Sequence, residues 1–195
     1  MPPRMLFKKE DVLNVAYEIV RKEGFENLNA RRIAAEMNSS VHPIFKHFSD
    51  MEDLKKSIYE KIFEKYHEYM FSGENKPRPY KEMGMSYIRF ARDYPEFFKI
   101  IFMNHGKIVP EDLIMSDKKL YENILKNVSG VTGIVEEADV KSFHLKMWIF
   151  THGIATMLAS GTCDISEEQI SSILTEEFKA LMLLEKKEGV IENEK

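Results

Sequence analysis

Cysteine is nearly absent from this chain of 195 residues, in which only Cys163 occurs. A single cysteine excludes an intrachain disulfide and suits a reducing compartment, so we expect a cytoplasmic protein. Long apolar runs are also missing, because the most hydrophobic stretch, Met147 to Ala159, is interrupted by threonine, histidine and glycine. A membrane-spanning helix needs about 18–20 consecutive apolar residues, so no such segment is expected. The opening Met-Pro-Pro-Arg-Met precedes no long apolar stretch, which argues against a secretory signal.

Glycine is sparse as well, and none of the nine glycines cluster into a loop that would cradle a nucleotide phosphate. The sequence also has no nucleophile elbow and no run of metal ligands. His144 and His152 lie two turns apart on one predicted helix, but no further ligand cluster accompanies them, which favours structural histidines. The sequence therefore predicts no catalytic residues, no metal site and no cofactor, and the protein is not expected to be an enzyme.

Positive charge is in short supply overall, since the net charge is −4. Its distribution is uneven: residues 1–57 carry ten Lys and Arg against nine Asp and Glu, and residues 58–195 carry eighteen against twenty-three. Contacts to nucleic-acid phosphates depend on local rather than total charge. Charge therefore permits DNA binding by the first segment without demonstrating it.

What the sequence does contain is apolar residues at helical spacing along almost its whole length, with no alternating strand pattern. Gly73 to Pro79 breaks the pattern, Val128 to Gly133 is expected to be a loop, and Ser49 to Glu52 and Ser166 to Gln169 are typical of capping boxes. The sequence predicts an all-α fold with a small domain in residues 1–57 and a larger helical domain in residues 58–195. The expected helices contain Val12 to Val20, a short segment capped by Asn29, and residues 41–47, 50–70, 80–94, 95–103, 116–127, 136–160 and 166–185.

The most informative segment is residues 30–47, in which the polar turn Asn38-Ser39-Ser40 separates two short helices. Helices joined by so short a turn cross steeply and need the first helix of the chain to complete their core. This arrangement is a helix-turn-helix, which presents the outer face of its second helix to the DNA major groove. Any short helical hairpin has similar spacing, so the spacing alone leaves DNA binding and a purely structural hairpin both open.

A resemblance extends this interpretation. The segment GFENLNARRIAAEMNSSVHPIFKHFSDMEDL, residues 24–54, resembles the DNA-binding region of the TetR family of bacterial repressors. The family usually has glycine at the places of Asn38 and His42, tyrosine at Phe45 and lysine at Met51. WIFTHGIATMLASG and YPEFFKIIFM are similar to a family C-terminal domain of the Trp–His–Gly type, with Trp148, His152 and Gly153 at the signature positions. The matching N-terminal positions are Gly24, Phe25, Asn29, Arg31, Ile33, Ala34, Ser40, Phe45, His47, Phe48 and Leu54.

The resemblance implies a DNA-binding site on the second helix and the turn. We expect base-edge contacts on the side away from Ile44, Phe45 and Phe48, with Lys46 reaching guanine acceptors and Val41 a thymine methyl group. The base-edge candidates are Ser39, Val41, His42 and Lys46. The candidates for phosphate contact are Asn29, Arg31, His47, Lys55, Lys56, Arg4 and Lys8, and Ser40, which caps the second helix, completes the set.

The resemblance also implies a ligand-binding and dimerisation role for residues 58–195. Seven of the twelve methionines of the chain lie in this segment from Met83 to the C-terminus. Methionine suits an adaptable apolar pocket, although ordinary core packing is the alternative for each residue. In the family, the last two helices of two subunits form a four-helix interface. In this chain, another helix could approach closely at the small residues Gly153, Ala155, Ala159 and Gly161. The candidates for an effector pocket are Tyr87, Phe90, Phe98, Phe102, Met147 and Trp148.

The predicted protein is thus a homodimeric repressor that binds a double-stranded DNA operator and a small apolar effector and does not associate with membranes. The alternative is a helical ligand- or partner-binding module that has lost DNA reading. Two observations favour that alternative. Phe45 and Met51 replace two residues that usually donate hydrogen bonds to phosphate, and the first segment is nearly neutral.

Overall fold

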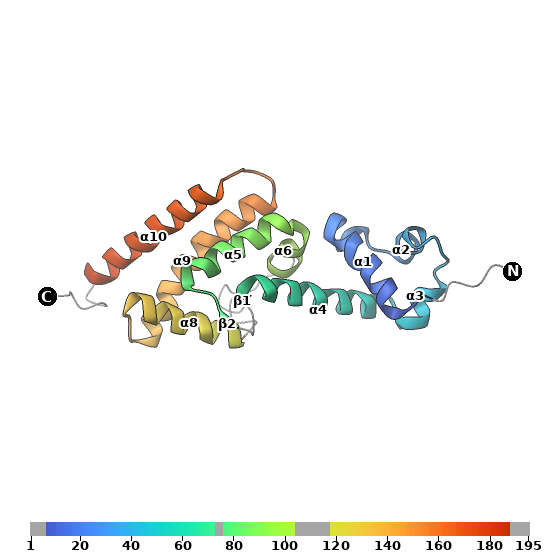
Figure 1. Ribbon diagram of the computed structural model, residues 1–195, viewed down its shortest axis with the longest axis horizontal. Coiled ribbons are helices and arrows are strands. Elements are labelled where there is room, and N and C mark those ends of the chain that lie inside the picture. Colours follow the sequence, from blue (N-terminus) through green and yellow to red (C-terminus); the bar gives the residue numbers. More distant parts are fainter. Residues whose placement is uncertain (1–6, 73–75, 104–117, 188–195) are drawn as a thin grey trace. The chain divides into compact units, whose positions relative to one another are not determined.

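The computed structural model describes residues 7–72, 76–103 and 118–187 (Figure 1). The described residues form helices, apart from one pair of two-residue strands, and this confirms the all-α prediction. Contacts divide the chain into two compact units, with one boundary in the long helix α4 at Tyr66. The sequence places the domain boundary earlier in the same helix, after residue 57. Within the described residues, no helix combines the length and the apolar character needed to cross a membrane.

The first unit contains three short or medium helices, most of the long helix α4, and one helix from later in the chain. Its elements are α1 (Lys9–Glu23), a 3-10 turn (Phe25–Asn27), α2 (Ala30–Glu36), α3 (His42–His47), α4 (Met51–Met70, up to Tyr66) and α6 (Pro95–Phe102). Helix α6 packs on α1, where the rings of Tyr17 and Phe97 lie 4.9 Å apart. We refer to α1, α2, α3 and the start of α4 as the head.

Each helix of the head buries the apolar stripe that its sequence predicts. Gly24 ends α1 with a φ of 74°, and its N–H donates to the carbonyl of Val20 at 2.9 Å. Glycine adopts this backbone conformation at low cost, whereas a side chain here would be strained and would meet the carboxylate of Glu96. The buried residues of the head are Val12, Ala16, Ile19, Val20, Leu28, Ile33, Ala34, Met37, Ile44, Phe48, Leu54 and Ile58.

The cap of α4 differs from its prediction by one residue. Asp50 Oδ1 accepts from the N–H of Asp53 at 2.8 Å, and Asp53 Oδ2 accepts from the N–H of Ser49 at 3.0 Å. The predicted capping box of Ser49 and Glu52 is therefore wrong. An aspartate carboxylate is as good an N-cap acceptor as a serine hydroxyl, and here Asp50 takes that role. Glu52 is left to pair with Lys55 instead.

The second unit is built around α5 and α9, which pack against each other, with α8 and α10 packed on the pair. Two strands lead into it as a short antiparallel pair, in which Phe71 lies opposite Pro77. Strands of two residues are too short to show an alternating pattern, which is why the sequence did not predict them. The elements are β1 (Phe71–Ser72), β2 (Lys76–Pro77), α5 (Tyr80–Asp93), α8 (Lys118–Thr132), α9 (Glu137–Ala159) and α10 (Glu167–Lys187).

Helices α5, α6, α9 and α10 lie within two residues of their predicted bounds, but α8 does not. The sequence predicts a loop from Val128, and this is wrong, because α8 continues to Thr132 and buries Val128 completely. The Thr132 hydroxyl donates to the carbonyl of Val128 at 2.7 Å, and Gly133 ends the helix with a φ of 75°. The predicted start of this helix at Ser116 lies outside the described residues. The capping box of α10 is confirmed, because Ser166 and Gln169 exchange backbone-to-side-chain hydrogen bonds.

Candidate nucleic-acid interface

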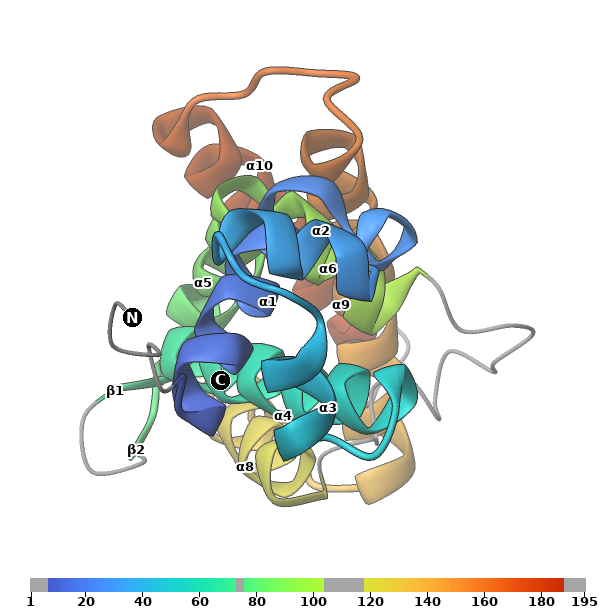
Figure 2. The ribbon, with the colours of Figure 1, turned by 90° about the vertical axis from the view of Figure 1, so that its right-hand side faces the viewer.

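The α2–α3 turn gives the head its shape. Asn38 has a φ of 48°, a left-handed conformation that asparagine tolerates better than most residues. The chain reverses there, and the N–H of Ser39 donates back to the carbonyl of Ala34 at 2.9 Å. Figure 2 faces the first unit and shows this turn leading from α2 to α3. Two short helices are thereby held at an angle, with Ile33 of α2 and Ile44 of α3 both fully buried beneath them.

The outer face of α3 carries Val41, His42, Phe45 and Lys46, and all four are exposed. We call it the reading face. The side chains of His42 and Lys46, and of Arg31 on α2, have no hydrogen-bond or ion-pair partner within the described part of the chain. Helix α3 contains no acidic residue. The reading face is therefore cationic at Lys46 and open to a partner.

Phe45 is the one residue of α3 whose predicted position is wrong. The sequence groups it with Ile44 and Phe48 on the inner side, whereas the structure exposes 48% of it. Ile44 and Phe48 are enough to fill the space beneath a helix of six residues, and Phe45 lies on the flank that they leave uncovered.

Several predicted phosphate contacts are engaged inside the head. Asn29 caps α2 by accepting from the N–H of Arg32 at 2.9 Å, and Lys55 pairs with Glu52 at 2.8 Å. The Nε2 of His47 lies 2.8 Å from the carbonyl of Phe7, to which it donates. These contacts hold the start of α1, the end of α3 and the start of α4 in place. Arg4 lies outside the described residues.

Neighbouring arginines of α2 have different surroundings, which the sequence did not reveal. Arg32 pairs with Glu23 at 2.8 Å and with Glu36 at 2.7 Å. The hydrogen bond to Glu23, its largest interaction, helps to raise the pKa of Arg32 above its ordinary value. Arg31, one residue earlier, is exposed. Arg32 therefore braces α2 against the end of α1, and Arg31 is the cation of this helix available to a phosphate.

Comparison of the sequence with known families finds no match, and neither does comparison with curated proteins. Comparison of the structure with solved structures does find similar chains. A TetR-family protein from Vibrio parahaemolyticus aligns over 89% of this chain and 98% of its own, with 15% identity and a TM-score of 0.62. A TetR-like transcriptional regulator from Rhodococcus sp. RHA1 aligns over 94% and 99%, with 12% identity and a TM-score of 0.61. A TetR-family regulator from Rhodococcus sp. aligns over 89% and 97%, with 14% identity and a TM-score of 0.61.

The chain has a TetR-like fold. The similarity covers nearly all of each solved chain, so both the head and the helical second unit belong to the shared architecture. At this level of identity the comparison concerns the fold alone, and the predicted contact residues have to be judged on their own surroundings.

The predicted effector residues do not all fall in one unit of this TetR-like fold. Phe98 and Phe102 lie on α6 in the first unit, where Phe102 packs edge-on against Tyr66 at 5.3 Å. Tyr87, Phe90, Met147 and Trp148 lie on α5 and α9 in the second unit, and all but Trp148 are buried.

Two tyrosine–histidine pairs join α5 to α9 within the second unit. The Tyr87 hydroxyl lies 2.9 Å from Nδ1 of His152, whose ring stacks on Trp148 at 4.7 Å. The Tyr80 hydroxyl lies 3.1 Å from Nδ1 of His144. Burial lowers the pKa of His152, lowers that of His144 to about 4, and raises that of Tyr80. His144 is therefore neutral near pH 7, as a structural histidine would be. Within the described residues, no cluster of three or more potential metal ligands occurs.

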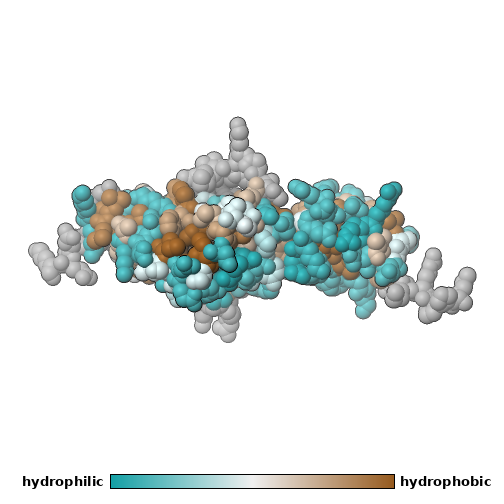
Figure 3. Space-filling view, turned by 90° about the horizontal axis from the view of Figure 1, so that it is seen from above, coloured by the Kyte–Doolittle hydropathy of each residue, from teal (hydrophilic) through white to brown (hydrophobic). Residues whose placement is uncertain are grey.

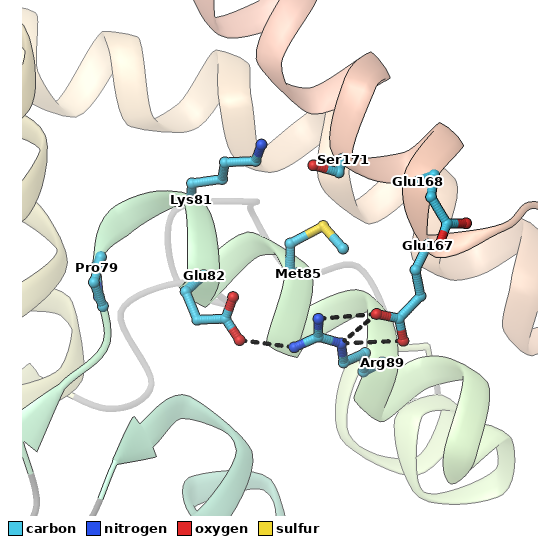
Figure 4. Close-up of a pocket in the computed structure, with 8 residues that line it drawn as sticks. All are labelled: Pro79, Lys81, Glu82, Met85, Arg89, Glu167, Glu168 and Ser171. Carbon is cyan, nitrogen blue, oxygen red and sulfur yellow. Dashed lines mark hydrogen bonds and ion pairs between the residues drawn. The ribbon is translucent and has the colours of Figure 1, made fainter.

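A polar groove lies between α5 and α10 in the same unit (Figure 4). Arg89 lines the groove and lies between two carboxylates, 2.7 Å from Glu82 and 2.9 Å from Glu167. Arg92 pairs with Glu167 as well, at 2.8 Å. The charges of the groove are thus largely satisfied internally, and they hold the first turn of α10 on α5. The lining residues are Pro79, Lys81, Glu82, Met85, Arg89, Glu167, Glu168 and Ser171, none of which was predicted to line the effector pocket.

The attachment of α10 through Glu167 is expected to weaken in acid. Hydrogen bonds from Arg89 and Arg92 lower the pKa of Glu167 from 4.5 to about 2. Because the pKa is depressed in the folded state, this stabilisation is complete above about pH 4.5 and is lost as the pH falls toward 2. In denaturant titrations from pH 6 to pH 2, the stability difference between the native chain and Glu167→Gln should shrink with falling pH. Glu176→Gln controls for loss of one charge from α10, and a constant difference for Glu167→Gln would contradict the assignment.

Proposed function

We propose that this protein is a homodimeric, sequence-specific DNA-binding transcriptional regulator of the TetR type that acts in the cytoplasm as a repressor. The observation that carries the proposal is the reading face, which has no acidic residue and a fully buried support beneath it, and whose Lys46 has no partner among the described residues. Such a surface on the second helix of a helix-turn-helix suits the major groove. Arg31 and Lys56 are exposed cations that suit phosphate contact beside it.

Dimerisation is proposed from the outer surfaces of α9 and α10. Ile149, Gly153 and Met157 recur every fourth residue on α9 and are all exposed, as are Leu183 and Leu184 on α10. Figure 3 shows apolar atoms gathered on the second unit on the side that it displays. A helix that is apolar on its inner and outer sides is normally covered on both. A second copy of this chain is the proposed cover, because one small head offers too few contacts for specific DNA binding.

A charge placed in the exposed α9 stripe of Ile149, Gly153 and Met157 is expected to separate the subunits. Ile149 is 54% exposed in the single chain, so Ile149→Asp should leave the subunit folded. In a two-fold interface each copy would bring its own aspartate, and burying these charges without partners is costly. We expect a shift from dimer to monomer in sedimentation equilibrium and a parallel loss of operator binding. Val135→Asp is the matched control, since Val135 is exposed before α9 begins, and equal behaviour of both variants would exclude this interface.

The effector site is proposed in the second unit, around Tyr87, Phe90, Met147 and Trp148. Helix α4 starts in the head and ends in the second unit, so it is the natural connection between an effector and the reading face. A small apolar effector would change DNA occupancy only to the extent that it binds the two states of the protein with different affinity.

The function is tested directly at Lys46. The full-length protein is titrated with its upstream promoter duplex and with random duplex at several salt concentrations. Lys46→Ala should weaken binding to the preferred sequence by about 1–3 kcal/mol. It should weaken binding to the random duplex by less than that. Lys126→Ala, which removes an exposed lysine of α8, should leave both affinities unchanged.

A steep fall of affinity with salt supports the regulator, because phosphate contacts release counterions. If Lys46→Ala loses the same affinity for every sequence, Lys46 contacts a phosphate and not a base. Absence of binding to any duplex at low salt would overturn the proposed function and favour a helical ligand- or partner-binding module.

A further inference from the structure

The reading face of α3 exposes two apolar side chains. Val41 is 38% exposed and Phe45 is 48% exposed, and the N–H of Phe45 donates to the carbonyl of Val41 at 3.4 Å. That hydrogen bond sets the two residues one helical turn apart, so their side chains lie on the same side of the helix. We call Val41 and Phe45 the apolar ridge.

The core of the head does not need the ridge. Ile44 is completely buried and Phe48 is 2% exposed, so these two residues anchor α3 to the rest of the head. The apolar area of the ridge that stays in water is therefore available to a partner, and its burial would favour association by about 25 cal/mol per Å².

The neighbours of the ridge indicate what kind of partner covers it. His42 and Lys46 form the adjacent stripe of α3, also one turn apart and exposed, and α3 carries no acidic residue. A ridge flanked in this way suits a surface that is anionic at its edges and bears small apolar groups within. The DNA major groove is such a surface, and the apolar group that its base edges present is the 5-methyl group of thymine.

We propose that Val41 and Phe45 select thymine in the operator by packing against its 5-methyl group, an inference that rests on the proposed function. Residues four apart on a helix are separated by about 6 Å along the axis. The rise between base pairs is about 3.4 Å, so the two side chains contact bases at most about two steps apart. The ridge therefore selects a short thymine-containing element in each half-site, and Lys46 reads the adjacent position.

The test removes the methyl groups one at a time. A preferred duplex is first selected from a random library with the full-length protein, and each thymine of the half-site is then replaced by uracil, which lacks only the 5-methyl group. We expect one or two positions at which uracil weakens binding by about three- to fivefold, the worth of about one buried methyl group. At those positions the uracil penalty should disappear in Phe45→Ala or in Val41→Ala. His42→Ala, on the adjacent stripe, should keep it.

The outcomes separate this inference from the function on which it rests. Binding to a selected sequence with no uracil-sensitive thymine, or with a penalty that persists in both ridge variants, overturns the inference and leaves the regulator assignment intact. Failure of the native protein to enrich or bind any duplex overturns both. Both ridge residues are exposed, so the variants should fold, and Phe45→Leu, which keeps an apolar contact, should keep part of the penalty.

Discussion

Ile44→Ala should unfold the head while the second unit stays folded. Ile44 is completely buried under α3, a helix too short to be stable without tertiary anchors. Truncation of a fully buried isoleucine costs about 2–5 kcal/mol. That is a large share of the roughly 5–15 kcal/mol by which a whole domain is stable. Amide hydrogen exchange should accordingly show loss of protection in α1, α2 and α3 but not in α5 and α9.

The control for this prediction lies two residues away on the same helix. Lys46→Ala changes an exposed side chain and should alter stability by less than about 0.5 kcal/mol. The pair of variants separates the stability of the head from its reading of DNA, because Ile44→Ala removes both and Lys46→Ala only the second. Native-like protection of the head in Ile44→Ala would show that α3 is held by something other than this contact.

Lys146→Met should destabilise the second unit by about 2 kcal/mol, because it leaves a buried carboxylate without its cation. Glu185 is 4% exposed on α10, and its Oε1 lies 2.9 Å from the Nζ of Lys146 on α9. Loss of one partner of a fully buried pair costs about 3–5 kcal/mol. The side chain of Lys146 is 39% exposed, so water weakens the interaction and the smaller value is expected. Denaturant unfolding at constant protein concentration measures the change.

Two further variants isolate the cause. Lys141→Met removes a similar pair on the same helix, but its partner Glu137 has a side chain 75% exposed, so the loss of stability should be much smaller than in Lys146→Met. The double variant Lys146→Met with Glu185→Leu replaces the whole pair by apolar groups and should recover most of the stability. If Lys146→Met and Lys141→Met lower the free energy of unfolding by the same amount, the burial of Glu185 has no special energetic role.

Local sequence was enough to predict most helices, because each signal depends on residues within one or two turns. The stripe of Leu54, Ile58, Ile62, Tyr66 and Met70 on α4 is buried along its full length, as its fourfold spacing predicts. Gly24 and the pair Ser166 and Gln169 end or begin helices by hydrogen bonds that span three or four residues. Where the local signal was ambiguous, as at Val128, the prediction failed, because complete burial of Val128 in the second unit outweighed the weak helix preference of the residues that follow.

The resemblance in residues 24–54 indicated the fold correctly, and the solved structures with a TetR-like fold confirm it. Which residues contact DNA or an effector remains a prediction. The structure refines it by showing which candidates are already engaged, such as His47 with Phe7 and Lys55 with Glu52.

By itself, the sequence determined the helical class, the turn at Asn38 and the buried stripes, since periodicity and capping are local properties of the chain. Only the tertiary structure decided that Phe45 is exposed while Phe48 is buried, and that Arg32 is paired while Arg31 is open. It also decided that Phe98 and Phe102 belong with α1 rather than with the other aromatic residues of the second unit. These outcomes depend on which distant segment packs against a given side, and no pattern within one helix specifies that segment.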